Sequence, residues 1–325
     1  MERSIKSNRV NYLRVSVTDR CNLRCVYCQT FEDKDFLPRS EILSYEEITK
    51  IVSILSLSGV SIVRFTGGEP LVRPQIEKLI SMIKEIRSIR SIGMTTNGVL
   101  LEEKLNYLKN SGLDTVNISI DSLKRERYKK ISGFDYLDRV WGSVVKAISA
   151  DFKAVKLNTI LLKGINDDEV LDFAELTLDN NIYVRFIEYF PTVSDFYTLK
   201  YRYVPNKLVK EKIERKFGKL LPVSEFVGNG PAKNYTIRGA AGYIGFINSN
   251  TEFFCHNCNR IRLSASGNLY PCLFSSFNIN VKEIVRKNEN EREIKKLLDE
   301  FLLNKGNYTK EKTRRYKFIM SDIGG

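Results

Sequence analysis

The stretch LRVSVTDRCNLRCVYC, residues 13–28, joins an alternating segment to three closely spaced cysteines. The alternation of apolar and polar residues in its first half predicts a β-strand. Cys21, Cys25 and Cys28 follow with the spacing C-x3-C-x2-C. Three thiols on so short a loop can bind one metal group together, but they cannot all pair in disulfides. They leave one iron of a four-iron cluster without a protein ligand, and we expect the chemistry at that iron.

Two other interpretations of this triplet are a zinc site and inert core cysteines. A structural zinc site needs four ligands, but no fourth cysteine lies nearby and the one histidine of the chain is His256. Core cysteines would not be set among Asp19, Arg20, Asn22 and Arg24. A 4Fe–4S cluster with one open iron is therefore the favoured interpretation.

The composition is that of a globular protein: of 325 residues, 42% are hydrophobic and 28% are charged. This length allows one large α/β domain and a smaller unit. No signal peptide and no apolar run of about 20 residues is present, and the cysteines indicate a reducing compartment, so we predict a cytoplasmic protein that does not bind a membrane. The net charge of +13 indicates either an anionic partner or substrate, or a solvated lysine-rich surface.

Strand and helix patterns alternate along the first 190 residues, which predicts six βα units on a parallel sheet. The predicted strands are residues 12–18, 61–66, 91–96, 115–121, 155–161 and 183–189. The predicted helices are residues 44–57, 74–86, 102–110, 137–150 and 167–178, with a charged connection at 124–130. Pro74 is expected at an early helical position.

One face of this predicted sheet is polar. Side chains alternate along a strand, so the following share faces: Arg14, Ser16 and Thr18; Arg64 and Thr66; Asn117, Ser119 and Asp121; Lys156 and Asn158. A parallel sheet with one face in water is uncommon, because crossover helices cover such sheets. We therefore predict a curved sheet whose apolar face takes the helices and whose polar face lines a ligand-filled lumen.

The pattern changes between Pro191 and Pro205, so we predict one domain at residues 1–190 and a second unit at 191–325. The second unit is expected to contain a helix at 207–217, strand-like segments at 221–226, 235–238 and 243–247, and a charged helix at 281–303. A hairpin turning at residues 266–268 should fold Cys272 back toward Cys255 and Cys258.

Cys255, Cys258 and Cys272 form a second triplet, C-x2-C-x13-C. Alone it could be a zinc half-site with His256, but a second three-cysteine cluster is favoured, because both triplets are one ligand short. Arg260 and Arg262 would share a strand face beside it, which suits a polyphosphate or a nucleobase edge. Without the adjacent cysteine, an ordinary basic surface strand would be the preferred interpretation.

The first triplet, with Tyr27 before its last cysteine, resembles the signature of the radical S-adenosylmethionine (SAM) superfamily. Residues 66–70, TGGEP, are similar to the GGEP motif of that superfamily, which meets the methionine amino group. The resemblance implies that the open iron binds SAM and that an electron through the cluster gives a 5′-deoxyadenosyl radical.

A narrower resemblance covers essentially the whole chain. The segments VTDRCNLRCVYC, RFTGGEPLVR, TTNG, NISIDSL, VKLNTILLKGIN, VRFIEYF, FCHNCNRIRLSASGNLYPCLF and a terminal GG follow in one order. Together they resemble the GTP 3′,8-cyclase family, also called molybdenum cofactor biosynthesis protein A. This implies an α/β fold, an incomplete (βα)6 TIM-type barrel with a C-terminal α+β unit covering the barrel opening, and a 4Fe–4S cluster at each end of a shared cavity.

By motif position, the resemblance also implies residue roles. The metal ligands would be Cys21, Cys25, Cys28, Cys255, Cys258 and Cys272; the SAM contacts Tyr27, Gly68, Glu69 and Ser119; the GTP contacts Arg14, Arg64, Thr95, Lys156, Arg260, Ile261 and Arg262; and the catalytic residues Arg185, Arg260 and Arg262. Arg73 is a further GTP candidate. The tail Gly324-Gly325 resembles one that enters the active site, and Phe190 stands where several relatives carry Met near the adenine.

The implied reaction is hydrogen abstraction from ribose C3′ of GTP and closure of C3′ onto C8, which gives 3′,8-cyclo-7,8-dihydro-GTP, the first step of molybdenum cofactor biosynthesis. The implied partners are an external one-electron donor and a downstream cyclic pyranopterin monophosphate synthase, with a homodimer left open. One alternative is a radical SAM peptide-modifying enzyme with an auxiliary cluster, which would need more C-terminal cysteines. A basic zinc module that binds nucleic acid is favoured only by the charge, and we expect no nucleic-acid partner.

Overall fold

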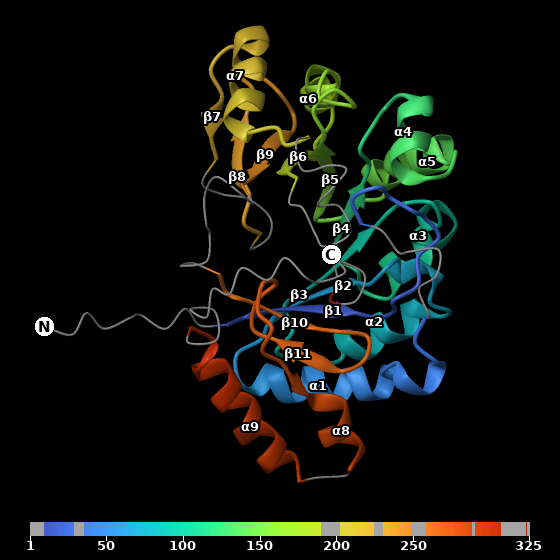
Figure 1. The fold of residues 1–325 in the computed structure, drawn as a ribbon, viewed down its shortest axis with the longest axis vertical. Coiled ribbons are helices and arrows are strands. Elements are labelled where there is room, and N and C mark those ends of the chain that lie inside the picture. The colour runs from blue at the N-terminus through green and yellow to red at the C-terminus, as the bar shows by residue number, and fades with distance from the viewer. Residues whose placement is uncertain are drawn as a thin grey trace, which may run out of the picture.

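The computed structural model describes residues 10–28, 36–189, 202–223, 230–248, 258–287, 290–306 and 323. Among them, strands form one curved sheet in the order β12-β11-β10-β1-β2-β3-β4-β5-β6-β9-β8-β7 (Figure 1). Its first six strands pair in parallel in chain order: β1 (Tyr12–Ser16), β2 (Ile62–Thr66), β3 (Ser91–Thr96), β4 (Thr115–Ser119), β5 (Ala154–Leu161) and β6 (Tyr183–Glu188). The six predicted strands are confirmed within one or two residues at each end.

Helices connect these strands on the outer side of the sheet: α1 (Tyr45–Leu57), α2 (Ile76–Lys84), α3 (Leu101–Asn110), α4 (Arg125–Ser132), α5 (Leu137–Ser149) and α6 (Val170–Asp179), with short 3-10 turns η1 (Arg39–Glu41) and η2 (Pro70–Val72). The capping box that opens α1 is present, because the Ser44 and Glu47 side chains each accept from the other's backbone N–H. This pair satisfies two N–H groups that the helix itself leaves unbonded.

Two helix predictions need correction. The charged connection at 124–130 is helical as α4, since Tyr128 and Ile131 anchor it in the interior and Gly133 ends it at φ 83°. Helix α2 begins after Pro74 rather than at it, because Gln75 adopts the left-handed backbone conformation (φ 58°), which a right-handed helix cannot include. Both corrections depend on local backbone geometry that hydrophobic periodicity does not report.

The apolar face of the parallel sheet forms the core. Leu13 and Val15 of β1 are fully buried together with Val63 and Phe65 of β2, and α1 covers them with Ile48, Ile51 and Leu55 among others. Fully burying an aliphatic side chain stabilises the fold by about 1.5–3 kcal/mol. The helices are therefore held on this face, and the opposite face of the sheet remains for the polar side chains.

The C-terminal part of the chain extends the same sheet at both edges. Strand β10 (Arg260–Leu263) pairs in parallel with β1, and β9 (Tyr243–Ile247) pairs in parallel with β6. The remaining strands are antiparallel additions: β7 (Leu221–Pro222), β8 (Lys233–Thr236), β11 (Asn268–Tyr270) and β12 (Ile279–Asn280). The predicted hairpin at 266–268 is confirmed as β10–β11, whereas the division at residues 190 and 191 stays a prediction.

Within the described residues, this part contains the helices α7 (Asn206–Phe217), α8 (Val281–Arg286) and α9 (Glu291–Leu303). The single helix predicted at 281–303 is therefore wrong. The Asn290 side chain accepts from the N–H of Arg292 and starts a new helix at Glu291. Helix α9 then lies against α1, where the Ser58 hydroxyl donates to Asp299 at 2.5 Å.

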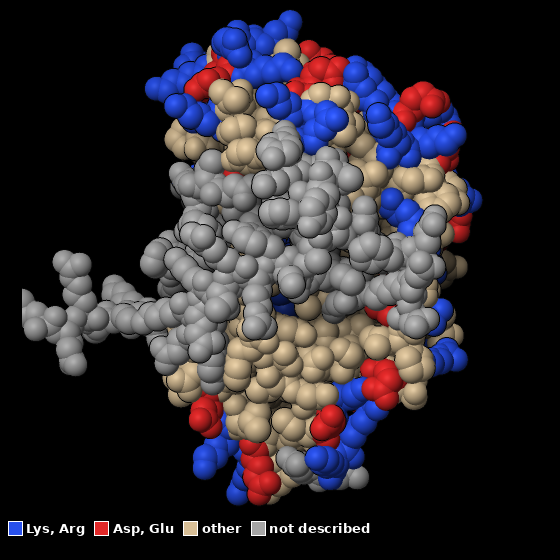
Figure 2. All heavy atoms as spheres, in the orientation of Figure 1, with Lys and Arg blue, Asp and Glu red and all other residues tan. Residues whose placement is uncertain are grey.

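Much of the positive charge is exposed at the end of the molecule that carries α6 and α7 (Figure 2). Lys207, Arg215, Lys216 and Lys219 are exposed on and just after α7. This part of the net charge fits a solvated surface, whereas the cations described below are buried. Of the helices in the described ranges, none has the length and apolar character to span a bilayer.

Candidate active site

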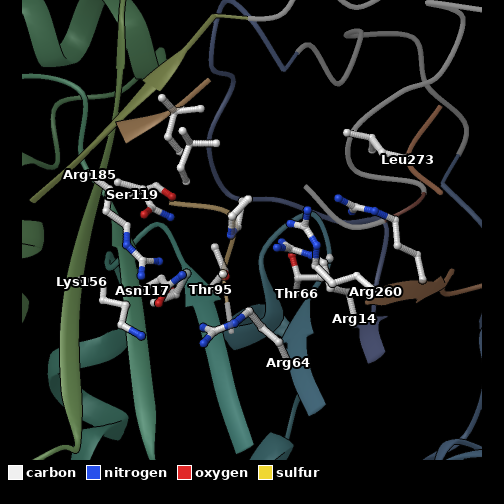
Figure 3. Close-up of a pocket in the computed structure, with 18 of the residues that line it drawn as sticks. Arg14, Arg64, Thr66, Thr95, Asn117, Ser119, Lys156, Arg185, Arg260 and Leu273 are labelled. Carbon is white, nitrogen blue, oxygen red and sulfur yellow. The ribbon is translucent and has the colours of Figure 1, made fainter. Parts of the chain in front are cut away.

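A cavity of about 650 Å³ lies against the polar face of the sheet. Its lining includes side chains from each of the six predicted strands and from β10: Arg14, Arg64, Thr66, Thr95, Asn117, Ser119, Asp121, Lys156, Asn158, Arg185, Arg260 and Arg262. Figure 3 shows several of them pointing into a common space from different strands. The predicted lumen is confirmed, and so is the alternation from which it was inferred.

Strand register orders this lining along the cavity. Arg14 pairs with Arg64 on one side and with Arg262 on the other, and Arg260 lies one pleat earlier, opposite Tyr12. Two further lining cations stand one and two pleats further toward the carboxyl ends: Lys156 opposite Asn117 and Arg185 opposite Asn158. Asp121, Glu69 and the first cysteine loop lie beyond those ends. The cavity thus has a basic part and a part with carboxylates and thiols.

Burial and repulsion by neighbouring guanidinium groups lower the pKa values of Arg14 and Arg262 in the basic part. Burial and the nearby Arg64 and Arg260 lower the pKa of Arg14 to about 10, although Tyr12 opposes the shift. Burial, followed by Arg14 and Arg260, holds the pKa of Arg262 well below its usual range. These charges would be stabilised by an anion in the cavity.

Several buried polar atoms in the lining have no hydrogen-bond partner within the described residues. They are Thr95 Oγ1, Asn117 Oδ1, Asn158 Oδ1, and Nε and Nη2 of Arg185. Burying a polar group without a hydrogen bond costs about 1–3 kcal/mol by protein mutational data. These hydrogen-bond donors and acceptors, which lie midway along the cavity, could therefore bind a polar ligand.

The first cysteine loop is held by backbone contacts. Gly68 N–H donates to Thr18 O and Glu69 N–H donates to Arg20 O, both at 2.8 Å. A Cβ on Gly68 would lie 2.3 Å from Arg20 O, so only glycine allows this approach. Here the glycine brings two backbones together, whereas the sequence suggested an approach to a ligand. Its contact with SAM stays a prediction.

Further contacts brace the same loop from the other side. The N–H groups of Arg24 and Val26 donate to the carbonyls of Ser132 and Ile131 at the end of α4, both at 2.9 Å. The Asn97 amide donates to Asn22 Oδ1 at 2.8 Å and lies 3.9 Å from Cys21 Sγ. The loop conformation is therefore set by the chain before any cofactor binds.

The Glu69 carboxylate is buried and already accepts three hydrogen bonds. The donors are Leu71 N–H at 2.9 Å, Thr96 Oγ1 at 2.7 Å and Asn97 N–H at 2.7 Å. Burial raises the pKa of Glu69 to about 7 despite these bonds. Glu69 joins the turns after β2 and β3, and its predicted contact with the methionine ammonium stays a prediction.

Carboxylates dominate the surroundings of the first cysteine loop, although Arg24 lies near Cys21. Burial and the nearby Glu69 raise the pKa of Cys21 to about 11, and burial and Asp121 raise that of Cys25 well above its usual value. Burial raises the pKa of Asp121 to about 6. Tyr27 donates to Asp121 Oδ2 at 2.5 Å, and Ile160 N–H donates to Oδ1 at 2.8 Å. Thiolates here need a cationic group beside them.

Cys258 and Cys272 of the second triplet lie at the other end of the sheet. Cys258 precedes β10, which runs parallel to β1, and Cys272 follows the antiparallel β11 back to the same edge. Burial alone would raise the pKa of Cys258, but Arg260 and Lys305 outweigh it and lower the pKa. Lys305 is 8% exposed and donates to Cys258 O at 2.8 Å. The surroundings of this triplet are thus basic, in contrast to those of the first.

Two family models match consecutive parts of the chain: the Radical SAM superfamily at residues 15–177 and Molybdenum Cofactor Synthesis C at residues 182–311. The GTP 3′,8-cyclase of Pelotomaculum thermopropionicum is 44% identical over 317 residues, 97% of this chain and 98% of the relative. That of Thermodesulfovibrio yellowstonii is 42% identical over the same shares. This chain belongs to the GTP 3′,8-cyclase family.

Solved structures support the radical SAM fold of this family member. Streptococcus suis SuiB bound to S-adenosylmethionine matches with a TM-score of 0.62 and 16% identity, over 84% of this chain and 63% of that chain. The chain therefore spans less than two thirds of SuiB. The structure of anSMEcpe with bound AdoMet matches with a TM-score of 0.57 and 15% identity, over 86% and 78% of the two chains. At such identities the likeness concerns the fold alone.

A radical SAM family implies a 4Fe–4S cluster and SAM, and the first triplet fits both. Cys21, Cys25 and Cys28 are thiols on one loop, partly buried, in surroundings that favour a cation. In the described ranges, no three His, Cys, Asp or Glu side chains are grouped as ligands of a single metal ion. Cysteine thiolates are the ligands of 4Fe–4S clusters, whereas a structural zinc site takes four protein ligands, so the three-thiol donor set suits a cluster rather than zinc.

Most predicted site residues come together in the structure. The cavity lining contains Cys21, Cys25, Cys28, Tyr27, Gly68, Glu69, Ser119, Arg14, Arg64, Thr95, Lys156, Arg185, Arg260 and Arg262. The Ile261 side chain does not line the cavity, because it is buried in the core on the opposite face of the sheet. Only the backbone of Ile261 could therefore contact GTP. Cys255, His256, Phe190, Gly324 and Gly325 lie outside the described residues.

The prediction that Arg73 contacts GTP is not supported, because Arg73 does not line the cavity. Its guanidinium donates to the carbonyls of Val17 and Leu43, each at 2.7 Å, and stacks over the Tyr45 ring. Arg73 therefore joins η2 to the segments around it. A position within a motif did not distinguish this structural arginine from a ligand-binding one.

Sequence reasoning assigned no role to Asn97, Asn117, Asn158, Asp121 or Lys305. The alternation along β4 and β5 did place Asn117, Asp121 and Asn158 on the lumen face, so that signal was available. Nothing in the sequence around Lys305 indicates its contact with Cys258, because the two are joined only by the tertiary fold.

We predict that Gly68→Ala disrupts the first cysteine loop. The added Cβ meets the Arg20 carbonyl at 2.3 Å, and such overpacking costs about 1–3 kcal/mol or more. The thermal midpoint and the iron content of the reconstituted protein should both fall. Gly306→Ala is the matched control, since its Cβ would meet nothing within 4 Å. Wild-type iron content in Gly68→Ala would contradict this role.

We also predict that Asp121 acts as a positioning residue for Tyr27. A hydrogen bond to a charged group contributes about 1.5–3 kcal/mol and a neutral one about 0.5–1.5 kcal/mol, so Asp121→Asn should weaken SAM binding several-fold and leave GTP binding unchanged. Tyr27→Phe should cause a similar loss, and the double variant should lose no more than either single one. Calorimetric affinities check this, and additive losses would refute the coupling.

Proposed function

We propose that this protein is a radical SAM enzyme that converts GTP to 3′,8-cyclo-7,8-dihydro-GTP, the first step of molybdenum cofactor biosynthesis. One observation carries the proposal: a single cavity joins a thiol loop flanked by carboxylates to a basic part formed by Arg14, Arg64, Arg260 and Arg262. SAM is cationic at its sulfonium and ammonium groups, whereas GTP is a polyanion. The charges of the cavity therefore favour one substrate at each end.

Cys21, Cys25 and Cys28 would hold the first 4Fe–4S cluster, with Glu69 facing the cationic groups of SAM and Asp121 holding Tyr27. When bound, the cluster and SAM supply a 5′-deoxyadenosyl radical as the hydrogen-atom acceptor for ribose C3′. The protein's own contribution is to hold C3′ at that end of the cavity and to exclude water, which protects reactive species.

The arginines would hold the triphosphate, because guanidinium donates to phosphate oxygens in a bidentate fork. Asn117, Thr95 and Arg185 would supply hydrogen bonds to the nucleoside, since their buried polar atoms lack partners within the described chain. Cys258 and Cys272, with Cys255, would hold a second cluster near the base. This arrangement orients GTP with its ribose toward the first loop.

The second candidate is a peptide-modifying radical SAM enzyme. The structural likeness to SuiB concerns its fold, and the three C-terminal cysteines remain fewer than auxiliary clusters would need. A cavity whose lining includes the largely buried cations Arg14, Arg64, Lys156, Arg185, Arg260 and Arg262 suits a small polyanion better than a peptide. An external one-electron donor and a synthase that consumes the cyclic product are partners we propose with this function.

The deciding experiment is an anaerobic reaction of the reconstituted, reduced protein with SAM and GTP, with products identified by mass. We expect 5′-deoxyadenosine and a cyclic nucleotide with the mass of the 3′,8-cyclised product. Iron and sulfide analysis should give two 4Fe–4S clusters per chain. Zinc in place of iron, or 5′-deoxyadenosine without any GTP-derived product, would contradict the proposal.

A further inference from the structure

Tyr12 is a buried tyrosine in the basic part of the cavity. It is 5% exposed at the start of β1 and belongs to the cavity lining. Its hydroxyl accepts a hydrogen bond from Nε of Arg64 at 2.6 Å. A tyrosine hydroxyl accepts through its oxygen and also has one proton to donate, so this bond leaves the proton available for an acceptor.

Among the described residues, none accepts that proton. The charged groups that act on the Tyr12 hydroxyl are the guanidinium groups of Arg64, Arg14 and Arg260, and a guanidinium can only donate. Burial alone would raise the pKa of Tyr12, but these three arginines outweigh it and lower the pKa. The hydroxyl is therefore a good hydrogen-bond donor in surroundings that favour an anion.

The Arg64 side chain is fixed at several points. Besides Tyr12 on β1, its guanidinium donates to Met94 O on β3 at 2.9 Å and to Thr115 Oγ1 on β4 at 3.0 Å. Figure 3 shows the guanidinium reaching from its own strand toward the strand that carries Thr95. The donor that holds the Tyr12 hydroxyl is therefore itself held in place by two neighbouring strands.

A glycine leaves the space that Arg64 needs. Gly93 of β3 lies between Arg64 of β2 and Thr115 of β4 in the register of the sheet. A Cβ on Gly93 would lie 2.5 Å from Nη2 of Arg64 and 2.7 Å from Thr115 Oγ1. Any side chain at this position would displace the guanidinium, so Arg64 can cross β3 because residue 93 is glycine.

We propose that Tyr12 binds the substrate through its hydroxyl, which donates to a phosphate oxygen of the triphosphate, and that Arg64 and Gly93 are positioning residues for this hydroxyl. The inference rests on the proposed function, because it requires a polyphosphate ligand. Arg260 lies directly opposite Tyr12 and Arg14 lies one pleat beyond it, so the acceptor that fits here is anionic. A hydroxyl donates a short, strong hydrogen bond to an anionic oxygen. Tyr12 thus adds a directional contact to the charge of the arginines.

Calorimetric titration of the anaerobic holoprotein with GTP, without SAM, tests the proposal on Tyr12→Phe. We expect its affinity for GTP to fall roughly 10- to 150-fold, the range for a hydrogen bond to a charged group. Inorganic triphosphate is the second probe, and its affinity should fall by a similar factor, because its oxygens are the proposed acceptors.

Thr115→Val is the matched control. Like Tyr12→Phe, it conserves the size of the side chain and removes one acceptor of Arg64, but it keeps the Tyr12 hydroxyl. Both variants should lower the thermal midpoint, whereas only Tyr12→Phe should lose affinity to the stated extent. Gly93→Ala tests the positioning role, since it moves the Arg64 guanidinium: its loss of affinity should be smaller in the Tyr12→Phe background than in the wild type.

Equal GTP affinity of Tyr12→Phe and the wild type would overturn the inference while leaving the proposed function intact. Equal losses in Tyr12→Phe and Thr115→Val would overturn it too, because Tyr12 would then only anchor Arg64. A loss confined to GTP would refute the phosphate acceptor, and additive losses with Gly93→Ala would refute the positioning role. Absence of GTP binding by the wild type would instead defeat the proposed function first.

Discussion

Cys21→Ala is expected to form no 5′-deoxyadenosine at all, whereas Cys272→Ala is expected to form it and to lose only the cyclic product. The first triplet lies beside the carboxylates of Glu69 and Asp121, whereas Cys258 of the second lies at the other end of the sheet beside Arg260 and Lys305. Radical formation and substrate placement are therefore separable. Measuring the nucleoside and the cyclic product in the same reaction checks both.

Iron analysis supplies the internal control for this pair of variants. Each variant should lose about half of the iron if each triplet holds one four-iron cluster. Cys258→Ala should repeat the phenotype of Cys272→Ala, because both side chains belong to the same triplet. Loss of 5′-deoxyadenosine in both second-triplet variants, with the iron of the first cluster retained, would contradict the division of roles.

Arg262→Met is expected to lower GTP turnover while leaving the unliganded fold as stable as the wild type or more so. Arg262 is 9% exposed and is repelled by Arg14 and Arg260, with Cys272 and Cys258 as smaller opposing influences, so its removal relieves like-charge repulsion. A charge-assisted hydrogen bond contributes about 1.5–3 kcal/mol, or roughly 10- to 150-fold in affinity. Steady-state kinetics and a thermal midpoint measured without substrate check the two halves of this prediction.

Arg73→Met is the matched control. Arg73 holds the carbonyls of Val17 and Leu43 and lies outside the cavity lining, so its removal should lower the thermal midpoint and leave GTP affinity unchanged. Cleavage of SAM without GTP should persist in Arg262→Met. Wild-type turnover of GTP by Arg262→Met would exclude the proposed phosphate contact.

The strands and the polar lumen face could be predicted because both are local properties. Alternation along a strand is a period-two pattern, and in a parallel sheet it assigns every second side chain to one face whatever the partners are. Arg14, Arg64 and Lys156 were therefore placed in the lumen from their own strands alone. The first cluster site could be predicted for a similar reason. Its three cysteines lie within eight residues, so no long-range contact is needed to bring them together.

The pairing of distant segments could not be predicted in the same way. β10 joins β1 across some 250 positions of sequence, and this pairing brings Arg260 and Arg262 beside Arg14. No periodic pattern within either strand selects the other as its neighbour. The contact of Lys305 with Cys258 likewise depends on how the elements pack. The same is true of Arg73, which lies outside the cavity lining, so its position within a motif led to the wrong prediction.

The sequence by itself determined the six βα units, the lumen face and the thiol loop, since each depends on spacing over a few residues. Only the tertiary structure decided that the C-terminal strands continue the sheet at both edges and that buried cations and carboxylates occupy different parts of one cavity. The physical reason is that burial and Coulomb interactions depend on distance in space.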